Sequence, residues 1–265
     1  MLTIFIHGTL PFSPLLKIPS LHTFCFCPPG LNCADNFDQK YHLARLATLL
    51  CKAQPDTYLL NRFYFFGWSG QLSARARKLA AQELYSSLKA LNYNQTGGIR
   101  IITYSHGGNL ALNLALIAQE HNDSQLIIEE LILLACPVQQ ETRELVYNPL
   151  FKRIYSLHSH KDMIQVLDPQ KVHALWTLIK QKSPRILLKE TKHIPLFSKR
   201  HFPTASHITQ AQIKLNGHKL FHVDFLSTAF MSQLPTCISY LEDIRASVNN
   251  HEQDIIVSLP LKTGN

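Results

Sequence analysis

The feature that most limits the fold of this chain is a repeated alternation between short β-rich apolar runs and longer segments with helical periodicity. The apolar runs are candidate strands and lie at 2–6, 57–66, 99–104, 127–135, 151–157 and 209–215. The candidate helices lie at 37–52, 72–91, 107–120, 140–147 and 223–246, and we expect Pro235 to kink the last one. This alternation is typical of an α/β fold with a mostly parallel sheet and helices on both faces.

The segment 72–91 shows how the helical pattern assigns a buried face. Apolar residues recur there at steps of three and four, and we expect them to cover the sheet: Leu72, Ala76, Leu79, Ala80, Leu84 and Leu88. Basic residues occupy other positions, and we expect them to face water: Arg75, Arg77, Lys78 and Lys89.

The chain of 265 residues, with 46% hydrophobic and 17% charged residues, is long and apolar enough to bury one full core. We therefore expect a single α/β domain over 1–265, with irregular lid-like segments near 10–34 and 158–207. The segment 10–34 is rich in apolar residues, so it is either a lid over a pocket or an ordinary flap on the core.

The first residues, MLTIFIHGTL, lack the basic start and the long apolar run of a signal peptide. No stretch approaches the roughly 18 apolar residues of a membrane span. We therefore expect a soluble, cytoplasmic protein. Six cysteines are expected to be reduced thiols, and these are Cys25, Cys27, Cys33, Cys51, Cys136 and Cys237.

The net charge of +8 is concentrated in one segment, 180–201, where seven basic residues face the single acid Glu190. A solvated connecting segment is the favoured interpretation, and a surface that binds an anionic membrane is the alternative. Nucleic acid is an unlikely partner, because no RNA-binding signature, zinc-finger spacing or basic heptad region accompanies the charge.

The sequence TYSHGG, 103–108, places Ser105 between a predicted strand and a predicted helix. A side chain at the tip of such a sharp turn projects away from both elements, and the first backbone N–H groups of the helix point into the same space. Gly107 and Gly108 suit a place where the two backbones approach closely. This setting favours Ser105 as a nucleophile, although a simple helix N-cap remains the alternative.

At this turn the chain resembles the α/β-hydrolase family, in its lipase and esterase branch. TYSHG matches the G-x-S-x-G pattern at the serine and the last glycine, while Thr103 replaces the first glycine. The resemblance covers about 1–246 and implies an α/β-hydrolase-like fold whose first strands are missing here. It also implies that the amide of His106 helps to hold an oxyanion.

The resemblance extends to IHGT, at the end of the first predicted strand. An HG dipeptide in this place implies that His7 and Gly8 line the substrate site and that the amide of Thr9 is the second oxyanion donor. A simple turn glycine after a strand is the alternative. Trp68, in FGWSG, follows the second predicted strand and either lines the same pocket or packs in the core.

The resemblance implies that an acid and a histidine follow the serine in this order along the chain. Asp162 lies just after a predicted strand and is the first choice for the acid, with Asp168 as the alternative. His222 is the first choice for the base. His218 is the second choice, and a hairpin across Asn216-Gly217 would put both histidines on the surface.

The other histidines fit less well: His207 precedes the last predicted strand, and His158 and His160 flank the acid loop, where they line the site or face solvent. His22, Cys25, Cys27 and Cys33 lie close in sequence but lack the second ligand pair of a zinc site, so we expect no metal.

The sequence therefore predicts a serine hydrolase with the catalytic residues Ser105, His222 and Asp162, which acts on a small-molecule or lipid ester without a cofactor. The alternatives are an acyltransferase with the same triad and a non-catalytic scaffold that binds an anionic surface through 180–201. The oligomeric state is left open.

Overall fold

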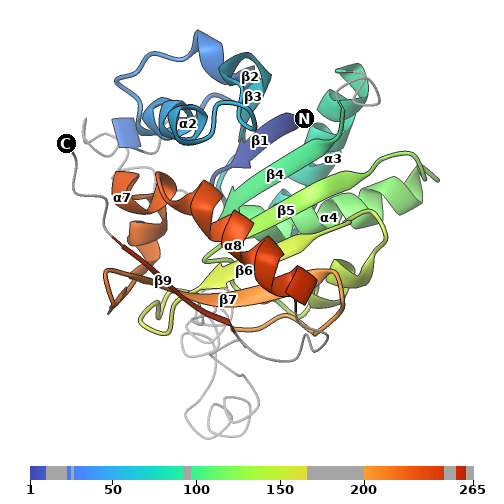
Figure 1. The fold of residues 1–265 in the computed structure, drawn as a ribbon. Helices are drawn as coiled ribbons and strands as arrows, with labels where there is room; N and C mark the ends of the chain where they lie inside the picture. Colours follow the sequence, from blue (N-terminus) through green and yellow to red (C-terminus); the bar gives the residue numbers. More distant parts are fainter. Residues whose placement is uncertain (10–22, 25–26, 92–96, 166–199, 248–254, 261–265) are drawn as a thin grey trace, which may run out of the picture.

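A mostly parallel sheet forms the centre of the computed structural model (Figure 1), which describes residues 1–9, 23–24, 27–91, 97–165, 200–247 and 255–260. The described strands are β1 (Leu2–Ile6), β2 (Gly30–Cys33), β3 (Phe63–Gly67), β4 (Ile99–Tyr104), β5 (Ile128–Leu134), β6 (Ile154–His158), β7 (Ile208–Leu215), β8 (His218–Lys219) and β9 (Ile255–Leu259). Their order is β2-β3-β1-β4-β5-β6-β7-β8, and β9 also pairs with β7. The pairs β2·β3 and β7·β8 are antiparallel, and the other neighbours are parallel.

Helices cover both faces of this sheet (Figure 1). One face packs against α3 (Ala74–Ala90) and α4 (Gly107–Glu120), and the other against α2 (His42–Ala53), α7 (Thr228–Met231) and α8 (Leu234–Ser247). Short 3-10 helices lie between these elements: η2 (Ala34–Asn36), η3 (Leu60–Arg62), η5 (Arg143–Tyr147) and η6 (His222–Leu226).

The apolar runs form strands because their side chains alternate between two buried faces. In β1, Ile4 and Ile6 belong to the core under α3 and α4, while Phe5 belongs to the core on the opposite face. A strand that is covered on both sides must be apolar along its whole length, as LTIFI and IRIITY largely are. The expected fold class, a mostly parallel α/β sheet with helices on both faces, is confirmed.

Several predicted element boundaries were wrong. The strand expected over 57–66 begins only at Phe63, after η3, and the strand expected over 151–157 is Ile154–His158. The helix expected over 140–147 is the 3-10 helix η5. The strands β2, β8 and β9 were not predicted. Each is short or half-exposed, so its own side chains carry little of the periodic signal.

The single kinked helix expected over 223–246 is also wrong, because the structure divides this segment into η6, α7 and α8. Ser227 begins α7 by accepting a hydrogen bond from the Phe230 N–H at 3.2 Å. Pro235 is the second residue of α8. Backbone N–H groups in the first turn of a helix have no partner within the helix, so a proline is tolerated there without a kink.

Two side chains of α3 differ from the predicted face. Leu79 is 56% exposed, although the pattern placed it against the sheet. Arg77, expected to face water, is fully buried, and its Nη2 donates to Gln139 Oε1 at 2.6 Å. α3 packs against α4 as well as the sheet, so its buried face is wider than the apolar stripe alone indicates.

Most of the predicted lid-like segments lies outside the described residues, as do Asp168 and positions 180–199 of the basic segment. Their predicted roles stay predictions. Among the helices that the structure describes, none is both long and apolar enough to cross a membrane.

Candidate functional site

Ser105 occupies a strained turn between β4 and α4. Its backbone φ is 53°, in the left-handed region that costs an L-residue about 1–3 kcal/mol and that functional residues often occupy. Two hydrogen bonds hold the turn: the Ser105 N–H donates to Leu134 O at 2.8 Å, and the Ser105 carbonyl accepts from the Gly108 N–H at 3.0 Å. The serine is therefore fixed at the carboxyl end of β4, beside the end of β5.

The turn after β1 touches this serine turn directly. A Cβ atom on Gly8 would lie 2.8 Å from the Ser105 Cβ, and one on Gly107 would lie 2.6 Å from the His7 carbonyl oxygen. Both distances are too short for any side chain. The glycines therefore allow the His7-Gly8-Thr9 turn and the start of α4 to approach as closely as the residue pattern predicted.

Asp162 and His222 form a buried pair at the same edge of the sheet. His222 Nδ1 lies 2.7 Å from Asp162 Oδ2, although the two residues are 60 positions apart in the chain. The other carboxylate oxygen, Oδ1, accepts from the Gln165 N–H at 3.0 Å. A carboxylate oxygen only accepts hydrogen bonds, so Nδ1–H of His222 is the donor in this pair and Nε2 is the ring nitrogen left for another partner.

Arg200 holds the loop that carries Asp162. Its Nη1 donates to the backbone carbonyls of Ser159 at 2.8 Å and Asp162 at 2.6 Å, and its Nη2 donates to the His160 carbonyl at 3.2 Å. Burial lowers the pKa of Arg200, and the Asp162 charge partly offsets this. The sequence pattern predicts a solvated basic segment around Arg200 and does not indicate this contact, because nothing local distinguishes Arg200 from its basic neighbours.

Tyr104, which the sequence analysis also missed, links β4 to the histidine loop. Its ring centroid lies 5.0 Å from that of His222, and its hydroxyl donates to the His222 carbonyl at 3.3 Å. The residue before Ser105 thus contacts His222. Within the described residues, however, the Ser105 hydroxyl itself donates no hydrogen bond, so the structure joins the acid to the histidine but not the histidine to the serine.

The predicted oxyanion donors border this serine. In the described part of the chain, the backbone N–H groups of Thr9 and His106 donate to no other group. Among the described residues, the Thr9 hydroxyl and the His106 Nδ1 are buried side-chain atoms that have no hydrogen-bond partner. Burial lowers the pKa of His106 to about 3, and the charges of Arg77 and His222 act in the same direction. The His106 imidazole is therefore neutral near pH 7.

His7 and Trp68 support the turn after β1. The Trp68 backbone N–H donates to His7 Nε2 at 3.2 Å, and its indole Nε1 donates to the His7 carbonyl at 2.9 Å. His7 Nδ1 is left to donate to the Gly8 carbonyl at 2.7 Å. Burial lowers the pKa of His7 to about 4. Trp68 is buried in the core cluster that also includes Ile6, and its role in lining a substrate pocket stays a prediction.

The second-choice histidine lies outside this arrangement. Asn216 and Gly217 have φ values of 51° and 77°, so a hairpin does connect β7 to β8, and it leaves His218 exposed. His222 lies beyond the hairpin and is buried beside Asp162. Of the remaining histidines, His158 is buried with its ring centroid 4.8 Å from that of His201, and His207 Nε2 lies 2.8 Å from the Val146 carbonyl oxygen.

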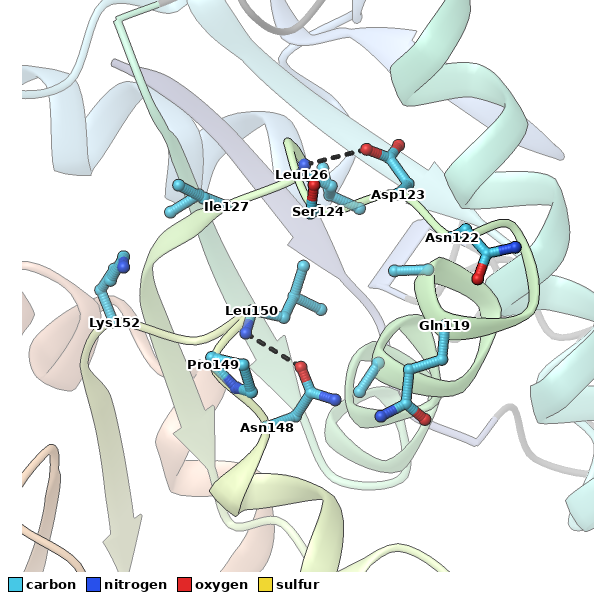
Figure 2. Close-up of a pocket in the computed structure, with 12 residues that line it drawn as sticks. Gln119, Asn122, Asp123, Ser124, Leu126, Ile127, Asn148, Pro149, Leu150 and Lys152 are labelled. Carbon is cyan, nitrogen blue, oxygen red and sulfur yellow. Dashed lines mark hydrogen bonds between the residues drawn. The ribbon is translucent and has the colours of Figure 1, made fainter.

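A hollow of about 500 Å³ lies away from all of these residues (Figure 2). Its lining includes Gln119 and Asn122 at the end of α4, Leu126 before β5, and Asn148 and Lys152 before β6. Ser105 precedes the other end of α4, and 14 helical residues span about 20 Å. The hollow therefore has no part in the arrangement around Ser105.

The described residues contain no group of three His, Cys, Asp or Glu side chains placed to hold a metal ion. Of the four residues considered for a zinc site in the sequence, Cys27 and Cys33 are described, and both are free thiols. His22 and Cys25 lie outside the described residues.

Comparison with known proteins gives a distant match in solved structures alone. No protein-family model matches the chain, and no curated protein matches it significantly. Two structures of the hyperthermophilic esterase from the archaeon Pyrobaculum calidifontis are 12% identical, with a TM-score of 0.34. The matches cover 98% of this chain and 67% and 65% of the esterase chains. The description of the fold as a mostly parallel α/β sheet with helices on both faces rests on the strand order and the two cores of the structure itself.

Proposed function

We propose that this protein is a serine hydrolase that cleaves carboxylic esters through an acyl-enzyme, with Ser105 as nucleophile, His222 as base and Asp162 as the orienting acid. The observation that carries the proposal is the buried 2.7 Å hydrogen bond between His222 and Asp162 at the sheet edge where the Ser105 turn lies. An acid, a histidine and a strained serine at one edge are the components that activate a hydroxyl.

The proton path follows from the tautomer of His222. Because Asp162 accepts a hydrogen bond from Nδ1–H, Nε2 can take the Ser105 proton as the serine oxygen attacks the ester carbonyl carbon. The imidazolium then gives that proton to the leaving alcohol, and an ester bond to Ser105 remains. Water attacks this ester next and loses a proton to His222. The bond between the acyl carbon and the Ser105 oxygen then breaks, His222 returns the proton to that oxygen, and the acid product leaves.

Two backbone amides support the charged intermediates in this proposal. The N–H groups of Thr9 and His106 are unused in the described structure; His106 follows Ser105 in the chain, and Thr9 follows Gly8, which lies against Ser105. One such donor lowers the barrier by about 3 kcal/mol. Neutral His106 adds no positive charge beside the imidazolium that forms on His222 in this proposal.

A fluorophosphonate probe tests the proposal, because it reacts covalently with an activated serine. The native chain is expected to be labelled and to hydrolyse a short p-nitrophenyl ester, whereas Ser105→Ala is expected to do neither. Ser227→Ala, which changes a serine that caps α7, is the matched control and should be labelled like the native chain. Equal labelling of native protein and Ser105→Ala, or no labelling of either, would overturn the proposal.

A further inference from the structure

Four exposed apolar side chains surround the Asp162–His222 pair. The described residues expose nine large apolar side chains, and four of them directly follow Asp162 or flank His222. We name these four the apolar rim: Met163 is 57% exposed, Ile164 56%, Phe221 52% and Val223 58%. Single exposed apolar residues are ordinary, but a group of them at one site indicates a contact surface.

The two loops that carry the rim are connected, so the four side chains belong to one surface. Lys161 Nζ lies 3.8 Å from the centre of the Phe221 ring, and the hydrogen bond between Asp162 and His222 also joins the loop after β6 to the segment that carries His222. Arg200 borders the part of the rim on the acid loop, because its Nη2 lies 3.8 Å from Met163 Sδ.

The charge around the rim is positive. Lys161 and Arg200 each touch a rim side chain, and Lys219 lies exposed two residues before Phe221. Among the described residues of these two loops the acids are Asp162, which is buried against His222, and Asp224, whose Oδ2 accepts from the Phe221 N–H at 2.7 Å, so the three cations outnumber them. Apolar side chains beside cations suit a lipid surface with anionic headgroups. The apolar side chains enter the acyl region of the lipid, and the cations contact the phosphates.

We propose that the apolar rim docks the protein on an anionic lipid surface, so that a lipid ester leaving that surface enters beside His222 and Ser105. This proposal rests on the proposed function for its substrate, but the docking itself does not need the serine. It also differs from the membrane contact considered for 180–201, because the rim lies on the loops that carry the acid and the base.

Flotation with lipid vesicles tests the docking. Native protein is expected to float with vesicles of phosphatidylcholine mixed with phosphatidylglycerol, and less with phosphatidylcholine alone. A double variant, Ile164→Ser with Val223→Ser, should reduce the bound fraction about tenfold or more, since each change removes most of one apolar contact. Leu59→Ser with Leu79→Ser is the matched control, because both leucines are exposed but lie outside the rim, and it should float like the native chain.

A charge variant keeps the test decisive if the double variant does not fold, as thermal unfolding will show. Lys161→Glu should weaken binding to the anionic vesicles and leave the weaker binding to phosphatidylcholine unchanged. Equal flotation of rim variant and control overturns the docking. So does a native dimer, seen by light scattering, that the rim variant dissociates, because the rim then covers a second copy.

The docking and the proposed function can fail separately. Vesicle binding is measured in a Ser105→Ala background as well, where docking should persist. Probe labelling in solution without flotation overturns the rim and leaves the hydrolase, whereas flotation without labelling overturns the hydrolase and leaves the docking surface.

Discussion

Ser105 combines a left-handed backbone with a side chain that such a backbone disfavours. Its φ of 53° is maintained by the hydrogen bonds to Leu134 and Gly108 and by the close contact with Gly8. These contacts hold the turn in place, but they do not remove the steric strain between the Cβ atom and the backbone in the left-handed conformation. Strain of this kind is typical of a residue whose position matters more than its contribution to stability.

This strain predicts an order of stability between two inactive variants. Glycine has no Cβ and adopts a positive φ without strain, although it gains entropy in the unfolded chain. We expect Ser105→Gly to unfold with a free energy about 1 kcal/mol higher than Ser105→Ala, which retains the Cβ. Urea denaturation of both variants measures the difference. A less stable glycine variant would show that the turn is not strained in solution.

The role of Asp162 predicts a loss of turnover without loss of fold. Asp162→Asn places an amide opposite His222 Nδ1, and the amide nitrogen can only donate, which favours the tautomer with the proton on Nε2. We expect kcat on a soluble ester to fall about 10³–10⁴-fold, with little change in KM. Asp168→Asn is the control and should retain most activity. The reverse ranking would move the acid to Asp168.

At the scale of the elements, the acid loop after β6 depends on a residue from a distant part of the chain. Arg200 donates to three carbonyls of this loop, those of Ser159, His160 and Asp162. The loop closes tightly on itself, since the Asp162 N–H donates to the Ser159 carbonyl at 3.1 Å. Arg200 is therefore a positioning residue, which acts on the reaction only through Asp162.

Removing this guanidinium should impair turnover more than substrate binding. Arg200→Gln keeps a single amide donor and is expected to lower kcat about tenfold or more, which corresponds to about 1.4 kcal/mol in the barrier, with KM nearly unchanged. Arg143→Gln is the control, since Arg143 pairs with exposed Glu144. A folded Arg200→Gln protein whose kcat is unchanged, or whose KM rises while kcat does not fall, contradicts the positioning role.

Sequence periodicity identified the helices and strands whose own apolar residues show that the element is buried. β1, β4 and α4 are apolar over most of their length and were placed within a residue or two. β9 is a strand because it pairs with β7, which its alternately exposed residues do not reveal. Tyr104 and Arg200 make their contacts across the fold, so no local pattern marks them, whereas Asp162 and His222 could be named because each follows a strand in a known chain order.

At the scale of the whole molecule, the sheet brings distant residues to one edge. Thr9 follows β1, Ser105 follows β4, Asp162 follows β6, and His222 follows the β7–β8 hairpin. Because these strands are parallel, their carboxyl ends lie on the same side of the molecule (Figure 1). The hollow near the end of α4 is at the other side, which separates it from this chemistry.

The buried histidines at this edge make the stability of the whole molecule depend on pH. Burial lowers the pKa of His7 to about 4 and that of His106 to about 3, whereas an unfolded histidine titrates near 6.5. Between those values the unfolded chain binds more protons than the folded one, so acid favours unfolding. The free energy of unfolding therefore keeps the full contribution of neutral His7 and His106 above pH 6.5, and it loses this contribution as the pH falls toward their folded pKa values of about 4 and about 3.

We therefore expect the free energy of unfolding to decrease by about 2 kcal/mol for each of these two histidines between pH 6.5 and pH 5. His7→Gln keeps an acceptor for the Trp68 N–H but does not titrate, so its stability should decrease less over this range. His218→Gln changes an exposed histidine and should leave the slope of the native protein unchanged. Urea denaturation at several pH values measures these slopes. If His7→Gln loses stability as steeply as the native chain, His7 is not the buried, neutral group that holds the turn after β1, and acid must act elsewhere in the fold.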